Sequence, residues 1–171
     1  MSSIDARGSV LLRFSSVTLA LSLILFSGCR SGQPELEVRQ HEVADRGADV
    51  MPFDLEKTNH VFQEMEDGGL QKVVVKDASD SEQIGRIRVH LQEEAARFRQ
   101  GDFSDPAQIH GHDMPGLSDL QMGAERIDIS YAELPDGAQV RYKTTDPDLI
   151  HAIHRWFEAQ RSDHGRHARE H

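Results

Sequence analysis

The 171-residue chain repeats one pattern of apolar positions at a fixed offset, without gaps. A fixed offset between matching apolar positions is typical of a duplicated supersecondary unit. The matched pairs are Val61 with Ile127, Met65 with Tyr131, Val74 with Val140, Asp80 with Asp146, Ile84 with Ile150, Ile87 with Ile153 and Leu91 with Phe157. A chain of this kind is expected to fold as two copies of one small unit.

Each copy predicts two strands followed by a helix. The predicted strands are residues 60–65 and 72–76 in the first copy, and 126–131 and 139–143 in the second. An Asp-Gly pair stands between the strands of each copy, at Asp67-Gly68 and Asp136-Gly137, and such a pair between alternating runs is a strong hairpin signal.

The helices are predicted from apolar residues spaced three and four apart, over residues 81–100 and 147–163. The first stripe is Ile84, Ile87, Leu91, Ala95 and Phe98, and the second is Ile150, Ile153, Phe157 and Gln160. Ser79 or Asp80 is expected to cap the first helix, and Asp146 the second, with Pro147 at its first position.

These elements predict an α+β fold in which the duplicated ββα unit gives a four-stranded antiparallel sheet with two helices on one face. The copies span about residues 60–100 and 126–165 of a single domain at 51–165. The insert between them, residues 101–125, is expected to be a packed helix–loop segment with short helices after Pro106 and at residues 118–122.

Cys29, the only cysteine, follows an apolar run at residues 17–26 that two arginines precede. This order is typical of a bacterial lipoprotein signal peptide, here residues 1–28, with Cys29 lipidated (for example by palmitate) after cleavage. The alternative, an uncleaved membrane anchor, is disfavoured because the uncharged stretch is shorter than the roughly 20 residues a spanning helix needs. Arg30 after the cysteine favours the outer membrane, facing the periplasm.

Residues 29–50 are polar and charged, without a sustained apolar period, and predict a flexible tether to the membrane. Residues 166–171 predict a solvated, histidine-rich tail. The net charge of −10 makes nucleic acid an unexpected partner. A lipidated Cys29 leaves no thiol for a disulfide, so the domain must be stabilised by its core or by a metal.

The candidate chemistry is metal binding, because all 10 histidines follow Cys29 and several are clustered. Imidazole suits copper and zinc, and a thioether favours copper, so the mixture of His and Met favours copper over zinc. The predicted ligands are His90, His110, Met114 and His164, with His154 in reserve. The alternative at each position is a packed or solvated histidine with no ligand.

Three stretches of the chain resemble a family of uncharacterised bacterial proteins. They are MPFDLEKTNHVFQ, the pattern RxHLxxEAxRFxxGDFSDPAxIHGxDMPGL from Arg88 to Leu117, and ISYAELPDGAQVRYKTTDPDLIHAIHRWFEAQRSDHG. Some members are labelled aspartate carbamoyltransferase. This chain lacks the Ser-Thr-Arg-Thr loop that binds carbamoyl phosphate and has half the length of a two-domain transcarbamoylase. The resemblance therefore implies no such activity.

Two other classes of function remain open from the sequence. One is an interaction module of the cell envelope that docks a protein partner, which the sequence does not identify. The other is a small periplasmic hydrolase that uses a carboxylate–histidine pair as acid and base. The sequence has no Gly-rich phosphate loop, nucleophile elbow or HExxH motif, so it names no catalytic residue.

Overall fold

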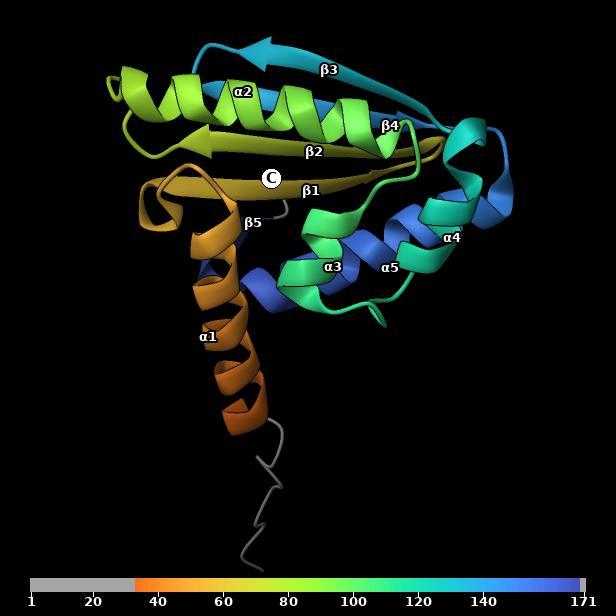
Figure 1. The fold of residues 1–171 in the computed structure, drawn as a ribbon, viewed down its shortest axis with the longest axis horizontal. Coiled ribbons are helices and arrows are strands. Elements are labelled where there is room, and N and C mark those ends of the chain that lie inside the picture. The colour runs from red at the N-terminus through yellow and green to blue at the C-terminus, as the bar shows by residue number, and fades with distance from the viewer. Residues whose placement is uncertain (1–32, 170–171) are drawn as a thin grey trace, which may run out of the picture. The chain divides into compact units, whose positions relative to one another are not determined.

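The computed structural model describes residues 33–169, which form an α+β domain (Figure 1). The predicted signal peptide and Cys29 lie outside the described residues. In chain order the elements are α1 (Gln33–Val50), η1 (Leu55–Lys57), β1 (Thr58–Met65), β2 (Gly68–Val75), α2 (Ser81–Phe98), α3 (Ser104–His110), α4 (Leu117–Gly123), η2 (Ala124–Arg126), β3 (Asp128–Leu134), β4 (Gly137–Lys143), α5 (Pro147–His164), η3 (Gly165–His167) and β5 (Ala168–Arg169).

The strands form one sheet in the order β3-β4-β2-β1-β5. The first four are antiparallel to their neighbours, which confirms the predicted four-stranded sheet. The two residues of β5 pair parallel with β1 at His60 and Val61. Residues that follow α5 therefore extend the sheet, so the predicted solvated tail at 166–171 is wrong at least as far as Arg169.

Both hairpins close with two-residue turns, at Glu66-Asp67 and at Pro135-Asp136. Gly68 leaves the first turn with a φ of +134°, a conformation that a residue with a side chain rarely adopts. The Asp-Gly pairs therefore lie at the two hairpin turns, as the sequence predicts.

Both copies have the predicted order of two strands and a helix, but the sequence offset between matching residues differs between the helices and the strands. The helices α2 and α5 have 18 residues each, and their first residues, Ser81 and Pro147, match each other at the predicted offset. The same offset would match Gly68, the first residue of β2, with Leu134, whereas its true counterpart is Gly137, the first residue of β4. The ungapped strand alignment was therefore wrong, because the connection from hairpin to helix is longer in the first copy.

The two helices begin where the caps predict. The side chain of Asp80 accepts a hydrogen bond from the Gln83 N–H, and Asp146 accepts one from the Asp148 N–H. Such caps satisfy donors that the first turn of a helix leaves unpaired. Helix α2 packs mainly on β3 and β4, and α5 on β1 and β2, so each helix covers the hairpin of the other copy (Figure 1).

Aromatic rings fill the core between the sheet and the helices. Trp156 of α5 is fully buried and meets Phe98, Phe103 and Tyr142 edge to face, at centroid distances of 6.2, 5.8 and 5.6 Å. Phe98 and Phe103 stack at 4.3 Å, which holds the start of α3 against the end of α2. The predicted insert is thus packed, as the apolar residues in it indicated, and it contains two short helices, α3 and α4. Helix α3 begins at Ser104, so Pro106 lies inside it and not before it, whereas α4 spans the predicted residues 118–122.

We expect Gly69→Ala to destabilise the fold, because a methyl group there would meet the Phe157 ring and lie 2.9 Å from Ile153 Cγ2. Overpacking of this kind costs about 1–3 kcal/mol. Gly85→Ala is the matched control: its added methyl group meets nothing within 4 Å, and Gly85 lies inside α2. This control should gain about 0.5–1 kcal/mol. Urea unfolding of both variants tests the pair, and equal effects would contradict the packing described.

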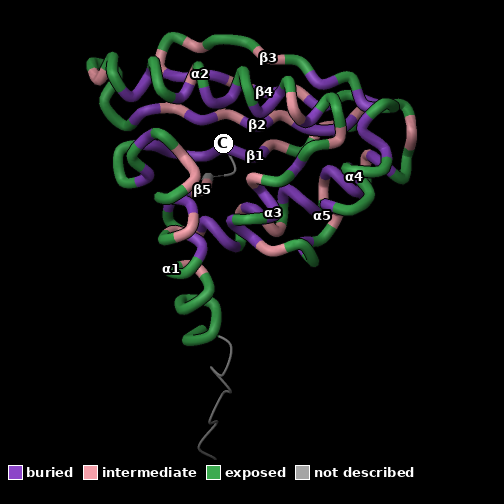
Figure 2. The backbone as a smooth tube through the Cα atoms, viewed as in Figure 1, coloured by how far each residue is buried: buried purple, intermediate pink, exposed green. Residues whose placement is uncertain are grey.

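The predicted flexible tether is wrong for residues 33–50, which form α1. The helix contacts α3 and α5, and its buried residues are Val43 and Gly47. Figure 2 shows that its first turns are exposed. Arg39 bonds to the Asp163 carboxylate, and Arg46 donates to the Ile109 carbonyl at 2.6 Å. A mostly polar helix has little apolar signal in sequence, so these tertiary contacts were not visible there.

None of the helices within residues 33–169 has both the length and the apolar character that a membrane span requires.

Candidate metal centre

The structure does not bring the five predicted ligands together in one group. Among residues 33–169, only one set of three or more His, Cys, Asp or Glu side chains has all its ligand atoms within 4.8 Å of one another, and it contains His90, Glu94 and Asp105. His110 and His164 lie together elsewhere in the core. Met114 is 4% exposed and packs in the hydrophobic core.

His90 and Glu94 face the same side of α2 because they are four residues apart. The Nε2 atom of His90 lies 3.5 Å from Glu94 Oε1, and both side chains are buried. Asp105 comes from the first turn of α3, which the stack of Phe98 on Phe103 holds against α2. Two elements thus converge on one imidazole and two carboxylates.

The electrostatics of this group are balanced by Arg97, which forms a bidentate ion pair with Asp105. Burial lowers the pKa of His90, but the hydrogen bond with Glu94 and the neighbouring carboxylates together raise it by more, so its net pKa is raised. The raised pKa favours the protonated ring beside Glu94. A divalent ion that binds His90 needs the neutral imidazole and therefore competes with protons.

A second cluster consists of three histidines from distant parts of the chain. The ring of His60, on β1, stacks on that of His164, on α5, at 4.7 Å and 9°. The ring of His110, at the end of α3, meets His164 edge to face at 5.0 Å. All three are buried, with exposed fractions of 2, 6 and 2% for His60, His164 and His110.

His110 is oriented by a chain of charged partners. Its Nδ1–H donates to Asp163 Oδ2 at 2.9 Å, and Arg39 donates to the same oxygen at 2.7 Å. Burial raises the pKa of Asp163, and the bonds from His110 and Arg39 lower it by more. Asp163 therefore stays ionised and fixes the His110 ring, whose Nε2 is left free of this bond.

Burial lowers the pKa of His60 to about 3, and it lowers that of His164 well below the usual range, so both rings are neutral at pH 7. Neither ring nitrogen of His60 has a hydrogen-bond partner among the described residues. A cavity of about 20 Å³ lies between the three histidines, and Gln160, Glu94 and Trp156 also line it. The Gln160 Oε1 and Trp156 Nε1 atoms are buried and unpaired too, within the same part of the chain.

His154 is occupied by the backbone of the first hairpin. Its Nε2–H donates to the carbonyls of Met65 and Gly68, at 3.0 and 2.9 Å. The His154 ring therefore stabilises the first hairpin turn, and it is a packed histidine with no ligand.

A surface groove of about 410 Å³ lies between α1 and the residues after α5. His164 lines both this groove and the internal cavity. His41, Glu56 and His167 also line the groove, and the His167 Nε2–H donates to Glu56 at 3.0 Å. His164 is therefore the side chain that lies between the internal cavity and the surface groove.

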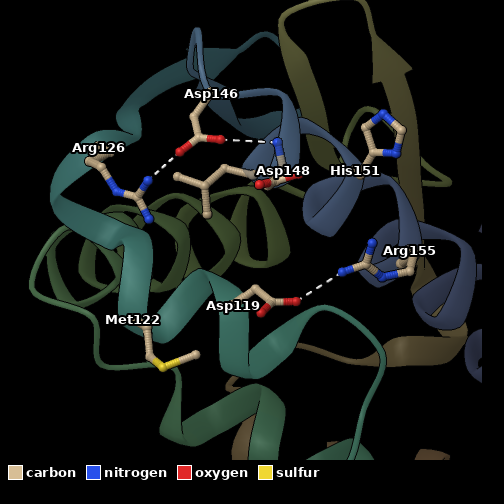
Figure 3. Close-up of a pocket in the computed structure, with 8 residues that line it drawn as sticks. Asp119, Met122, Arg126, Asp146, Asp148, His151 and Arg155 are labelled. Carbon is tan, nitrogen blue, oxygen red and sulfur yellow. Dashed lines mark hydrogen bonds and ion pairs between the residues drawn. The ribbon is translucent and has the colours of Figure 1, made fainter.

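Another pocket, of about 460 Å³, lies at the start of α5 (Figure 3). Four of its charged side chains form two ion pairs, Arg126 with Asp146 and Arg155 with Asp119, and Asp148 also lines it. His151, also on its wall, is exposed. The pocket presents no unpaired buried polar group among the described residues and supports no assignment.

The sequence missed His60, Glu94, Asp105 and Arg39. One of these carried a local signal, since Glu94 follows His90 by four residues on a predicted helix. Asp105 and Asp163 are brought into place by tertiary contacts alone. Comparison of the chain with protein-family models, with curated proteins and with solved structures finds no match.

Proposed function

We propose that the chain is a cell-envelope lipoprotein whose domain binds a divalent metal ion through His90, Glu94 and Asp105. The proposal depends on one observation: ligand atoms from three side chains, two of them buried, lie within 4.8 Å of one another. Arg97, paired with Asp105, supports it because an outer partner that orients a ligand is a regular feature of metal sites.

The donor set favours hard or borderline ions at this site. One imidazole and two carboxylates suit manganese, iron or zinc, whereas copper(I) prefers sulfur. The expectation of copper rested on Met114, which lies in the hydrophobic core and contributes nothing to this group. We therefore propose manganese or zinc here.

The test is calorimetric titration of the full chain with Mn²⁺. We expect one equivalent to bind, and Glu94→Gln to weaken binding about 10- to 100-fold, because the amide keeps the shape of the side chain and loses its charge. His112→Ala is the matched control, since His112 is exposed and outside the group. Binding of equal strength in Glu94→Gln and the native chain would contradict the site.

The membrane anchor is a separate part of the proposal. Helix α1 begins four residues after Cys29, so a lipid on that cysteine would hold the domain close to the bilayer, with little free chain between them. We expect Cys29→Ser to move the protein from the membrane fraction to the soluble fraction and to abolish incorporation of labelled palmitate. A membrane-bound Cys29→Ser protein would contradict the lipid anchor.

A docking module has less support from the structure. The exposed large apolar side chains among the described residues stand on three different helices, at Leu36 and Val38, Val89 and Met122. A protein-binding surface usually presents such side chains as one contiguous patch.

A further inference from the structure

We propose that the cavity between His60, His110 and His164 is a second metal site, which binds a copper(II) or zinc ion through imidazole nitrogens. This site is distinct from the group at His90, and it goes beyond the function proposed above. No carboxylate of the first group other than Glu94 reaches it.

The two unpaired ring nitrogens of His60 destabilise the ion-free protein. His60 is 2% exposed, and both of its ring nitrogens lack a partner within residues 33–169. A buried polar atom without a hydrogen bond is destabilising. Phe53 and Phe62 flank the ring, so an apolar residue would suit the same position without that cost. A bound ligand explains why an imidazole stands there.

The orientation of His110 also points to a bound ion. His110 gives its Nδ1–H to Asp163, which leaves the lone pair of Nε2 for a ligand. A carboxylate that holds the far nitrogen in this way is the usual outer partner of a metal-binding histidine. Arg39 holds the carboxylate in turn.

The cavity has room for an ion, and a surface groove lies next to it. The cavity of about 20 Å³ is lined by all three rings, and about 10–15 Å³ suffices for one water molecule or an ion of similar size. The groove beside α1 reaches His164 from the surface. The nitrogens of the three rings do not all lie within the 4.8 Å spacing of the first group, so the rings must turn toward the ion as it binds.

The experiment uses Cu²⁺ as the probe on the full chain, with pulsed electron paramagnetic resonance to count the coordinated imidazoles. We expect at least two imidazoles in the native protein. His60→Leu should weaken copper binding by at least about tenfold and should raise the stability of the ion-free protein, because the unpaired nitrogens are gone. His164→Gln provides a second variant in case His60→Leu does not fold.

Asp105→Asn separates the two sites. We expect it to weaken Mn²⁺ binding at the first group, which offers one imidazole, and to leave the copper signal of two or more imidazoles unchanged, while His60→Leu does the reverse. A copper signal of two or more imidazoles that persists in His60→Leu and His164→Gln would overturn the second site, as would one that vanishes in His41→Ala. A native protein that binds no Cu²⁺ would overturn it too, and the cavity would then hold water. The copper results with His60→Leu, His164→Gln and His41→Ala do not depend on whether Mn²⁺ binds at His90.

Discussion

Lowering the pH from 8 to 4.5 is expected to remove about 3 kcal/mol from the free energy of unfolding through His60 alone. The pKa of His60 is about 3 in the folded protein and 6.5 when unfolded. Between these values the unfolded chain takes up a proton that the folded chain refuses. The stabilisation is therefore complete above pH 6.5 and falls as the pH drops toward 3.

Other groups act on the same pH range. His164 adds to the loss, since its pKa is also lowered by burial, and Asp163 adds to it at lower pH because its pKa is lowered as well. His90 acts in the opposite sense, since its raised pKa contributes stability that is present below pH 6.5 and is lost as the pH rises through its folded value. Two buried neutral histidines outweigh this one group.

Urea unfolding from pH 8 to pH 4.5, with a chelator present, measures the effect. His60→Leu should flatten the profile, and His151→Ala, which changes an exposed histidine, should leave it as in the native chain. A native protein that is equally stable at pH 4.5 and pH 7 would show that the histidine cluster is not buried in its neutral form.

Removing α1 is expected to destabilise the domain by about 2.5–6 kcal/mol, the sum of a packing loss and a charge loss. Val43 is 1% exposed, and burial of a valine side chain is worth about 1.5–3 kcal/mol. Asp163, itself 3% exposed, would lose its bonds to Arg39, and a buried charge that loses its partner costs about 1–3 kcal/mol or more. A chain that starts at Met51 should therefore unfold at a clearly lower urea concentration than the full chain.

Point variants separate the causes within α1. Val43→Ala should destabilise by about 1–2.5 kcal/mol, whereas Val38→Ala, at a position 59% exposed, should change stability by less than about 0.5 kcal/mol. Equal effects of the two variants, or equal stability with and without the helix, would mean that residues 33–50 are a tether after all.

The sequence predicts those parts of the fold that depend on neighbouring residues. The strands and turns follow from alternation and Asp-Gly pairs, and the helix starts follow from Asp80 and Asp146. Helix α1 and strand β5 could not be predicted, because polar segments gain their structure from tertiary contacts such as that of Arg39 with Asp163. The offset of the repeat holds for the helices but not for the hairpins, since connection length is not encoded in apolar spacing.

The candidate site is harder to predict than the fold, for a physical reason. Residues close in sequence, such as His110 and Met114, face different surroundings once they pack. Residues far apart, such as His60 and His164, meet because α5 packs on β1. The His90–Glu94 pair is the exception, because a helix places residues four apart on one face whatever its tertiary context.

Anomalous X-ray diffraction from crystals of the protein grown with Mn²⁺ tests the metal site most directly. We expect a single strong anomalous peak within bonding distance of His90 Nε2, Glu94 and Asp105. A map with no peak at these three side chains, from crystals that hold manganese elsewhere or hold none, would contradict the proposed metal centre.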